Sequence, residues 1–215
     1  MKDGFIRVAA ATPDIHVADP QYNSEQIIEL MEQGSTRGVK VMAFPELCLT
    51  AYTCSDLFLQ ESLLREAKKE LKRILQASKS KDMILFVGMP WMHKGKLYNV
   101  AAVLNRGRIL GIVPKKHLPN YSEFYELRHF NPGMEKVEMT DWEGVQVPMG
   151  MNLLFACRTM PELVLAAELC EDVWVPCPPS ISHALAGATV IANCSASDET
   201  TGKDQYRYNL ICGQS

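Results

Sequence analysis

The sequence lacks both a dense run of lysine or arginine and a long apolar run. Its 22 lysine and arginine residues are offset by 25 aspartate and glutamate residues, which leaves a formal net charge of −3. Binding to nucleic acid or to an anionic membrane uses concentrated positive charge, so this distribution argues against both partners. The longest apolar stretches, such as residues 163–167, are far shorter than the roughly 20 residues of a transmembrane helix. We therefore expect a small neutral or zwitterionic ligand, with no nucleic acid and no membrane.

Two further patterns are missing. Residues 1–5 show no basic segment leading into an apolar run, so no signal peptide is predicted and the cytoplasm is the expected location. No cysteine belongs to a C-x-x-C pair, and a chain of 215 residues is long enough to bury a core without covalent staples. We therefore expect reduced thiols and no metal site. The seven cysteines are Cys48, Cys54, Cys157, Cys170, Cys177, Cys194 and Cys212.

The composition is that of an ordinary globular domain, with 47% apolar and 22% charged residues and no repeats. Strand patterns alternate with helix patterns along the chain, which predicts a single α/β domain over residues 1–215. Strands are expected at residues 5–11, 39–44, 83–89, 98–104, 108–113, 164–167 and 189–193. Helices are expected around residues 27–31, from about 57 to 77, at 180–186 and near the C-terminus.

Three ionisable residues, Glu46, Lys115 and Cys170, each directly follow a predicted strand. The carboxyl ends of strands are where α/β proteins build their sites, so these side chains can meet. A thiol attacks a carbonyl as its thiolate, which requires a base such as Glu46 to take the proton or a cation such as Lys115 to stabilise the charge. The residues alone leave other roles open. Cys170 could be an inert buried thiol, Glu46 a turn cap, and Lys115 with Lys116 a solvated lysine pair.

Three segments carry a family resemblance. Residues 44–58 (FPELCLTAYTCSDLF), 114–126 (PKKHLPNYSEFYE) and 168–176 (ELCEDVWVP), the last followed by 178–180 (PPS), resemble the glutamate, lysine and cysteine motifs of the nitrilase superfamily. They have the form found in bacterial glutamine-dependent NAD synthetases. The resemblance implies a four-layer α-β-β-α sandwich. It also implies that the chain stops before the last strands of that fold, as an incomplete glutamine amidohydrolase domain without the synthetase domain.

The resemblance assigns roles to the three post-strand residues. It makes Glu46 the general base, Lys115 the transition-state stabiliser and Cys170 the nucleophile that becomes a glutamyl thioester. Superfamily members often have a second glutamate shortly after the lysine, for which Glu123 is the better match and Glu126 the weaker one. We also expect Cys170 to be a low-pKa thiolate that is alkylated before the other cysteines.

Further residues are expected around the substrate. The resemblance implies that Tyr121, Glu171 and Ser197 line a glutamine pocket. For Tyr52 and Phe124, core packing and substrate contact are equally good interpretations.

The activity implied is hydrolysis of L-glutamine to glutamate and ammonia, without a cofactor. Ammonia would pass to a synthetase domain of the same full-length chain, and only that domain would use ATP and magnesium. No glycine-rich phosphate-binding loop is visible in this sequence. A homo-oligomer is also expected. The alternatives are another nitrilase-superfamily amidase or carbamoylase, and a catalytically silent interaction domain that retains the fold.

Overall fold

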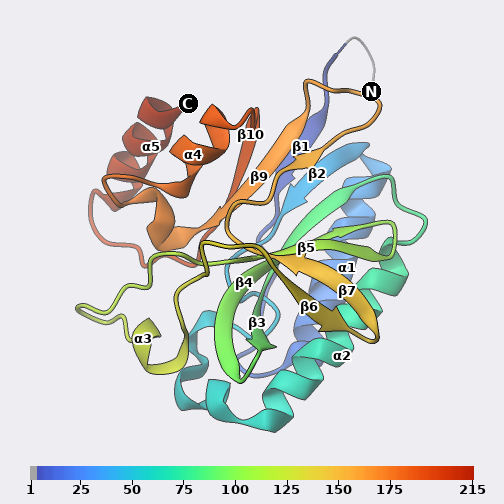
Figure 1. Cartoon of the computed structure of the whole chain (residues 1–215). Coiled ribbons are helices and arrows are strands. Elements are labelled where there is room, and N and C mark those ends of the chain that lie inside the picture. The colour runs from blue at the N-terminus through green and yellow to red at the C-terminus, as the bar shows by residue number, and fades with distance from the viewer. Residues whose placement is uncertain (1–3) are drawn as a thin grey trace.

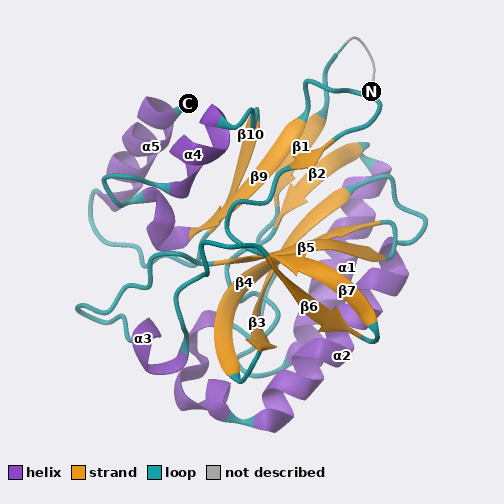
Figure 2. Cartoon of the chain, in the orientation of Figure 1, coloured by secondary structure: helices purple, strands orange, loops and turns teal. Residues whose placement is uncertain are grey.

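The computed structural model describes residues 4–215, which form two β-sheets packed face to face (Figures 1 and 2). The larger sheet has, in spatial order, β1 (Arg7–Ala10), β2 (Val39–Ala43), β3 (Ile84–His93), β4 (Lys96–Asn105), β5 (Arg108–Pro114), β7 (Val145–Met149) and β6 (Glu138–Trp142). The smaller sheet has the order β10 (Val190–Cys194), β9 (Val164–Leu169) and β8 (Phe155–Ala156).

Helices cover the outer faces of both sheets. α1 (Pro20–Thr36) and α2 (Glu61–Ser78) lie along the larger sheet, whereas α4 (Pro179–Leu185) and α5 (Lys203–Gln214) lie on the side of the smaller one (Figure 1). Three short helices sit in loops: η1 (Tyr52–Leu59), α3 (Glu126–His129) and η2 (Cys170–Val173). The layers are therefore helix, sheet, sheet and helix, which confirms the predicted four-layer α/β fold. None of the helices in residues 4–215 has the length and apolar content needed to cross a bilayer.

The core follows from the alternation of apolar residues along the central strands. In β3, Leu85 and Val87 face α1 and α2, whereas Phe86 between them faces the smaller sheet. The inter-sheet layer also includes Val103 of β4 and Leu165 of β9. Because successive side chains of a strand point to opposite faces, β3 and β4 must be apolar on both faces to fill both layers.

The predicted elements are present, with three differences. The helix expected from about residue 57 begins at Glu61, because the chain first makes the kinked 3-10 segment η1. The strands expected at 83–89 and 98–104 extend toward each other as β3 and β4 and form a hairpin that turns at Lys94 and Gly95. Strands β6, β7 and β8 were not predicted. They are only two to five residues long, so any alternation of apolar residues is too brief to indicate them.

Candidate active site

The three post-strand residues meet at one place although 69 and 55 residues separate them in sequence. Glu46 lies in the loop after β2, Lys115 directly after β5 and Cys170 directly after β9. The Nζ atom of Lys115 donates to Oε1 of Glu46 at 2.6 Å, and both side chains are fully buried. Cys170 is close enough that the charges of Glu46 and Lys115 both act on its thiol. The structure thus brings together the three residues expected to carry chemistry.

Burial raises the pKa of the Cys170 thiol, and the negative charge of Glu46 raises it further. The charge of Lys115 and a hydrogen bond with the backbone of Ala196 act in the opposite direction without reversing the shift. The expectation of a low-pKa thiolate is therefore wrong. Cys170 rests as a neutral thiol, because a thiolate in this buried place would lie beside a carboxylate. Its proton has to leave as the attack occurs.

Lys115 is held between two carboxylates. Besides Glu46, its Nζ donates to Oε1 of Glu126 at 2.5 Å. Burial alone would lower the pKa of Lys115, but the charges of Glu46 and Glu126 outweigh it and raise the pKa above its usual value. The ammonium group therefore stays charged. Two of its three donors contact these carboxylates, and no other partner is present among residues 4–215, which leaves one donor for a substrate oxygen.

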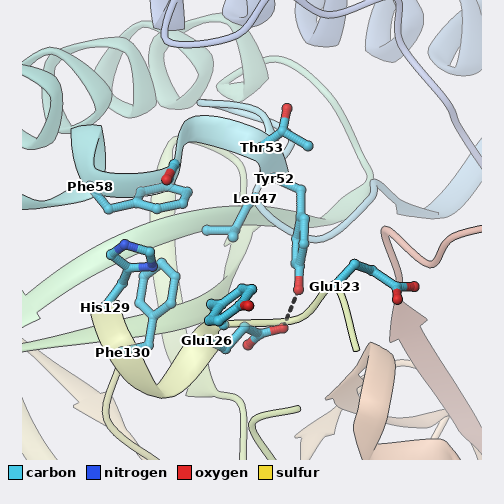
Figure 3. A pocket seen from close by; sticks show the side chains of 10 residues that line it. Leu47, Tyr52, Thr53, Phe58, Glu123, Glu126, His129 and Phe130 are labelled. Carbon is cyan, nitrogen blue, oxygen red and sulfur yellow. Dashed lines mark hydrogen bonds between the residues drawn. The ribbon is translucent and has the colours of Figure 1, made fainter. Parts of the chain in front are cut away.

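The glutamate beside Lys115 is Glu126, not Glu123. The Glu126 side chain is buried and also accepts a 2.7 Å hydrogen bond from the Tyr52 hydroxyl, which Figure 3 shows. Glu123 is exposed, and its side chain points away from the Tyr52–Glu126 pair. The sequence favoured Glu123 by position in the motif. The short helix α3 begins at residue 126, however, and this turn directs Glu126 inward. Burial and the charge of Glu46 raise the pKa of Glu126 to about 7.

Asn99 is a site residue that sequence reasoning missed. Its Nδ2 donates to Oε1 of Glu46 at 2.6 Å and to Oε2 of Glu126 at 3.4 Å, and its backbone carbonyl accepts from the Lys115 amide at 2.9 Å. One residue of β4 therefore contacts both carboxylates and fixes the backbone of Lys115. The available signal was a single asparagine inside the otherwise apolar segment 97–104, since a polar residue in a central strand requires polar partners.

Asp172 connects the loops that carry Lys115 and Cys170, and the sequence analysis missed it. Its buried carboxylate accepts hydrogen bonds from the backbone amides of Leu169 at 3.1 Å, Lys116 at 3.4 Å and His117 at 2.8 Å. Burial raises the pKa of Asp172 to about 6. The loop that carries Cys170 is thereby joined to the loop that carries Lys115.

Backbone geometry positions Cys170 and Glu46. Cys170 has a φ of 41°, a left-handed conformation that turns the chain sharply from β9 into η2. The loop of Glu46 crosses β3 at Gly88, where an added Cβ would lie 2.3 Å from the carbonyl oxygen of Pro45 and 2.4 Å from the amide nitrogen of Leu47. Only glycine permits this approach.

The residues expected to line a substrate pocket lie around this centre. The Tyr121 hydroxyl is 3.0 Å from both carboxylate oxygens of Glu171. Phe124 lies between two tyrosines, with edge-to-face ring contacts to Tyr52 at 6.4 Å and to Tyr121 at 5.6 Å. Ser197 lies one residue after Ala196, whose backbone contacts Cys170. The residues expected to line the pocket therefore lie near the Cys170 thiol. That they contact a substrate stays a prediction.

Residues 4–215 contain no cluster of three or more His, Cys, Asp or Glu side chains arranged to hold a metal ion. All seven cysteines lie in this range and are free thiols.

Comparisons with known proteins identify the family. The carbon-nitrogen hydrolase family model matches residues 7–210. The chain belongs to the carbon-nitrogen hydrolase family. It is 41% identical over 204 residues to a glutamine-dependent NAD(+) synthetase of Mycobacterium tuberculosis, which covers 95% of this chain and 30% of that protein. The human glutamine-dependent NAD(+) synthetase is 27% identical, again over about a third of its length. The chain thus corresponds to a domain of these longer relatives.

Solved structures share the fold of this chain. A glutamine-dependent NAD(+) synthetase from Cytophaga hutchinsonii superposes with a TM-score of 0.86 at 28% identity, over 97% of this chain and 33% of that one. An amidase from Nesterenkonia sp. AN1 superposes with a TM-score of 0.73 at 19% identity, over 98% of this chain and 73% of that one. The second likeness, at this low identity, concerns the fold alone.

Proposed function

We propose that this domain hydrolyses L-glutamine to glutamate and ammonia through a thioester on Cys170. The observation that carries the proposal is the buried contact of Glu46 with Lys115 beside the Cys170 thiol. General base, cation and nucleophile are the three groups that acyl transfer from an amide needs. The 41% identity to a glutamine-dependent NAD(+) synthetase supports glutamine as the amide.

In this mechanism Glu46 removes the Sγ proton of Cys170 while sulfur attacks the carboxamide carbon. A C–S bond forms, the C=O π electrons move to oxygen, and the remaining donor of Lys115 stabilises that oxyanion. The Oε2 atom of Glu46 has no hydrogen-bond partner within the described chain, so this oxygen is free to accept the proton. Glu46 then returns the proton to nitrogen as the C–N bond breaks and ammonia leaves. Water, deprotonated by Glu46, hydrolyses the thioester and regenerates the thiol.

The pocket residues supply a rationale for an amino-acid substrate. Glu171 with Tyr121 offers an acceptor for an α-ammonium group, and Ser197, next to the Ala196 whose backbone contacts Cys170, offers a hydroxyl. We further propose that the released ammonia serves the ATP-dependent amidation of nicotinate adenine dinucleotide to NAD. That step would take place in the cytoplasm, on a synthetase domain of a longer, homo-oligomeric protein.

The test measures ammonia and glutamate release from glutamine by the wild-type chain, by Cys170→Ala and by Cys177→Ala as the control. Cys177 is exposed and outside the site, so its variant should keep wild-type activity, whereas Cys170→Ala should lose it. A diazo-ketone analogue of glutamine should add one covalent mass to the peptide containing residue 170. Asparagine, simple aliphatic amides and N-carbamoyl amino acids are tested in parallel. Turnover of one of these with none of glutamine would identify a different amidase or carbamoylase, and no turnover with no adduct would indicate a catalytically silent domain.

A further inference from the structure

Two short elements beside the site, η1 and α3, face each other across a pocket of about 230 Å³ (Figure 3). Leu47, Phe58 and Phe130 form much of its apolar wall, and Glu126 lies at its edge. Phe58 of η1 packs edge-to-face on Phe130 at 4.9 Å and lies 5.9 Å from the ring of His129. Where the pocket separates the two elements, polar contacts between them add to this apolar packing in setting their relative placement. The tight Lys115–Glu126 contact depends on this placement, since Glu126 is the first residue of α3.

Polar contacts bridge the rim at two places. At one, Tyr52, the first residue of η1, donates to Glu126. At the other, Asp56 of η1 accepts from Arg128 twice, at 2.7 Å from Nε to Oδ1 and at 2.9 Å from Nη2 to Oδ2. The Nε2 atom of His129 is also 2.9 Å from Oδ1 of Asp56. Asp56 thus contacts two consecutive residues of α3.

α3 needs such an anchor because it has only four residues. A single turn is too short to be stable by its own hydrogen bonds. An isolated exposed ion pair would contribute little, and the side chains of Asp56 and Arg128 are 57% and 60% exposed. The arrangement here is stronger than an isolated pair, because it is bidentate and because His129 is 8% exposed. Hydrogen bonds from Arg128 and His129 hold the pKa of Asp56 well below its usual range.

We propose that Asp56 is a positioning residue for the amidase reaction, which holds α3 through Arg128 and His129 and thereby keeps Glu126 against Lys115. This inference rests on the proposed function. If α3 shifts, Lys115 loses the hydrogen bond to one of its two carboxylates, and its ammonium group reorients. Its free N–H donor then no longer points at the oxyanion. A displacement of about 1 Å can lower a rate by roughly 100-fold.

The test compares Asp56→Asn with Asp82→Asn. Asp82 is a similarly exposed carboxylate that also contacts two basic residues, Lys40 and Arg106, but it lies outside the site, in the loop between α2 and β3. Hydrogen exchange of residues 119–131 reports the placement of α3. Active-site titration with the glutamine analogue counts competent sites, so that kcat per site and KM can be compared without a contribution from unfolded protein.

We expect Asp56→Asn to lose exchange protection at residues 126–131 and at least tenfold in kcat per titrated site, with a smaller change in KM. Asp82→Asn should match the wild type in exchange protection, in kcat per titrated site and in KM. Unchanged protection in Asp56→Asn, or lost protection with wild-type kcat, would overturn the inference. If the wild-type chain hydrolyses no amide, the proposed function fails. The rate of Cys170 alkylation then replaces kcat, and equal rates in wild type and Asp56→Asn would overturn the positioning role.

Discussion

The carboxylate of Asp172 accepts a 2.8 Å hydrogen bond from the backbone amide of His117, which joins the loop of the nucleophile to the loop of the lysine. The same carboxylate accepts from the amides of Leu169 and Lys116, so that both of its oxygens are used. Two segments that lie more than 50 residues apart therefore share one acceptor group.

Asp172→Asn should disrupt both stability and activity. The amide nitrogen of asparagine cannot accept a hydrogen bond, so at least one backbone N–H becomes unpaired inside the protein, at a cost of about 1–3 kcal/mol. Denaturant unfolding measures this loss, and kcat should fall at least tenfold because Lys115 and Cys170 shift relative to each other. Asp141→Asn is the control, since Asp141 accepts from Gly144 in an exposed turn and its change should be nearly neutral. Equal stability of the two variants would contradict the role of Asp172.

Gly88→Ala should displace the loop of Glu46. The added methyl group would overlap backbone atoms of Pro45 and Leu47, which cannot rotate away as a side chain could. We expect a destabilisation of about 1–3 kcal/mol, as for overpacked cores, together with a fall in kcat. The control is Gly213→Ala in α5, where an added Cβ meets no atom within 4 Å and alanine favours the helix. A wild-type kcat in Gly88→Ala would show that Glu46 does not depend on this close approach.

Labelling of the thiols should depend on the reagent. A simple alkylating agent should first modify Cys177 and Cys212, which are exposed. Cys157, partly exposed, should also react early, because hydrogen bonding with Thr159 lowers its pKa. Cys170 is buried and its pKa is raised, so it should react first only with a glutamine-like electrophile that Lys115 can polarise. Peptide mapping after a short exposure distinguishes these orders. Preferential labelling of Cys170 by a simple reagent would indicate a thiolate at rest.

Glu126→Gln should change how stability depends on pH. The pKa of Glu126 is raised from 4.5 to about 7, so the folded protein binds a proton more tightly than the unfolded chain does. The wild type therefore loses stability as pH rises between about 4.5 and 7, and this contribution is constant above that range. The side chain of the Glu126→Gln variant resembles the neutral acid, so the variant does not lose this stability as pH rises. Relative to the wild type, Glu126→Gln should be more stable at pH 8 than at pH 5, as measured by thermal or denaturant unfolding. A difference that does not vary with pH would contradict the shift.

Much of the fold could be predicted from the sequence because its signals are local. The apolar spacing of residues 64–75 determines an amphipathic helix, and the apolar runs around Leu85 and Val103 determine buried strands. The positions of Glu46, Lys115 and Cys170 directly after strands, together with three motifs, were enough to predict that these three residues meet. The short strands β6, β7 and β8 have patterns too brief to indicate them without the sheets they join.

The tertiary structure alone decided which groups surround those three residues and in which protonation state they rest. Asn99 and Asp172 contact the site through pairings between chain segments distant in sequence, and the turn of α3 chose Glu126 over Glu123. The raised pKa of Cys170 has the same origin, because it depends on burial and on the charge of Glu46 rather than on neighbouring residues in the chain. Sequence determines residue types and local periodicity, whereas desolvation and charge interactions depend on distances that exist only after the sheets have packed.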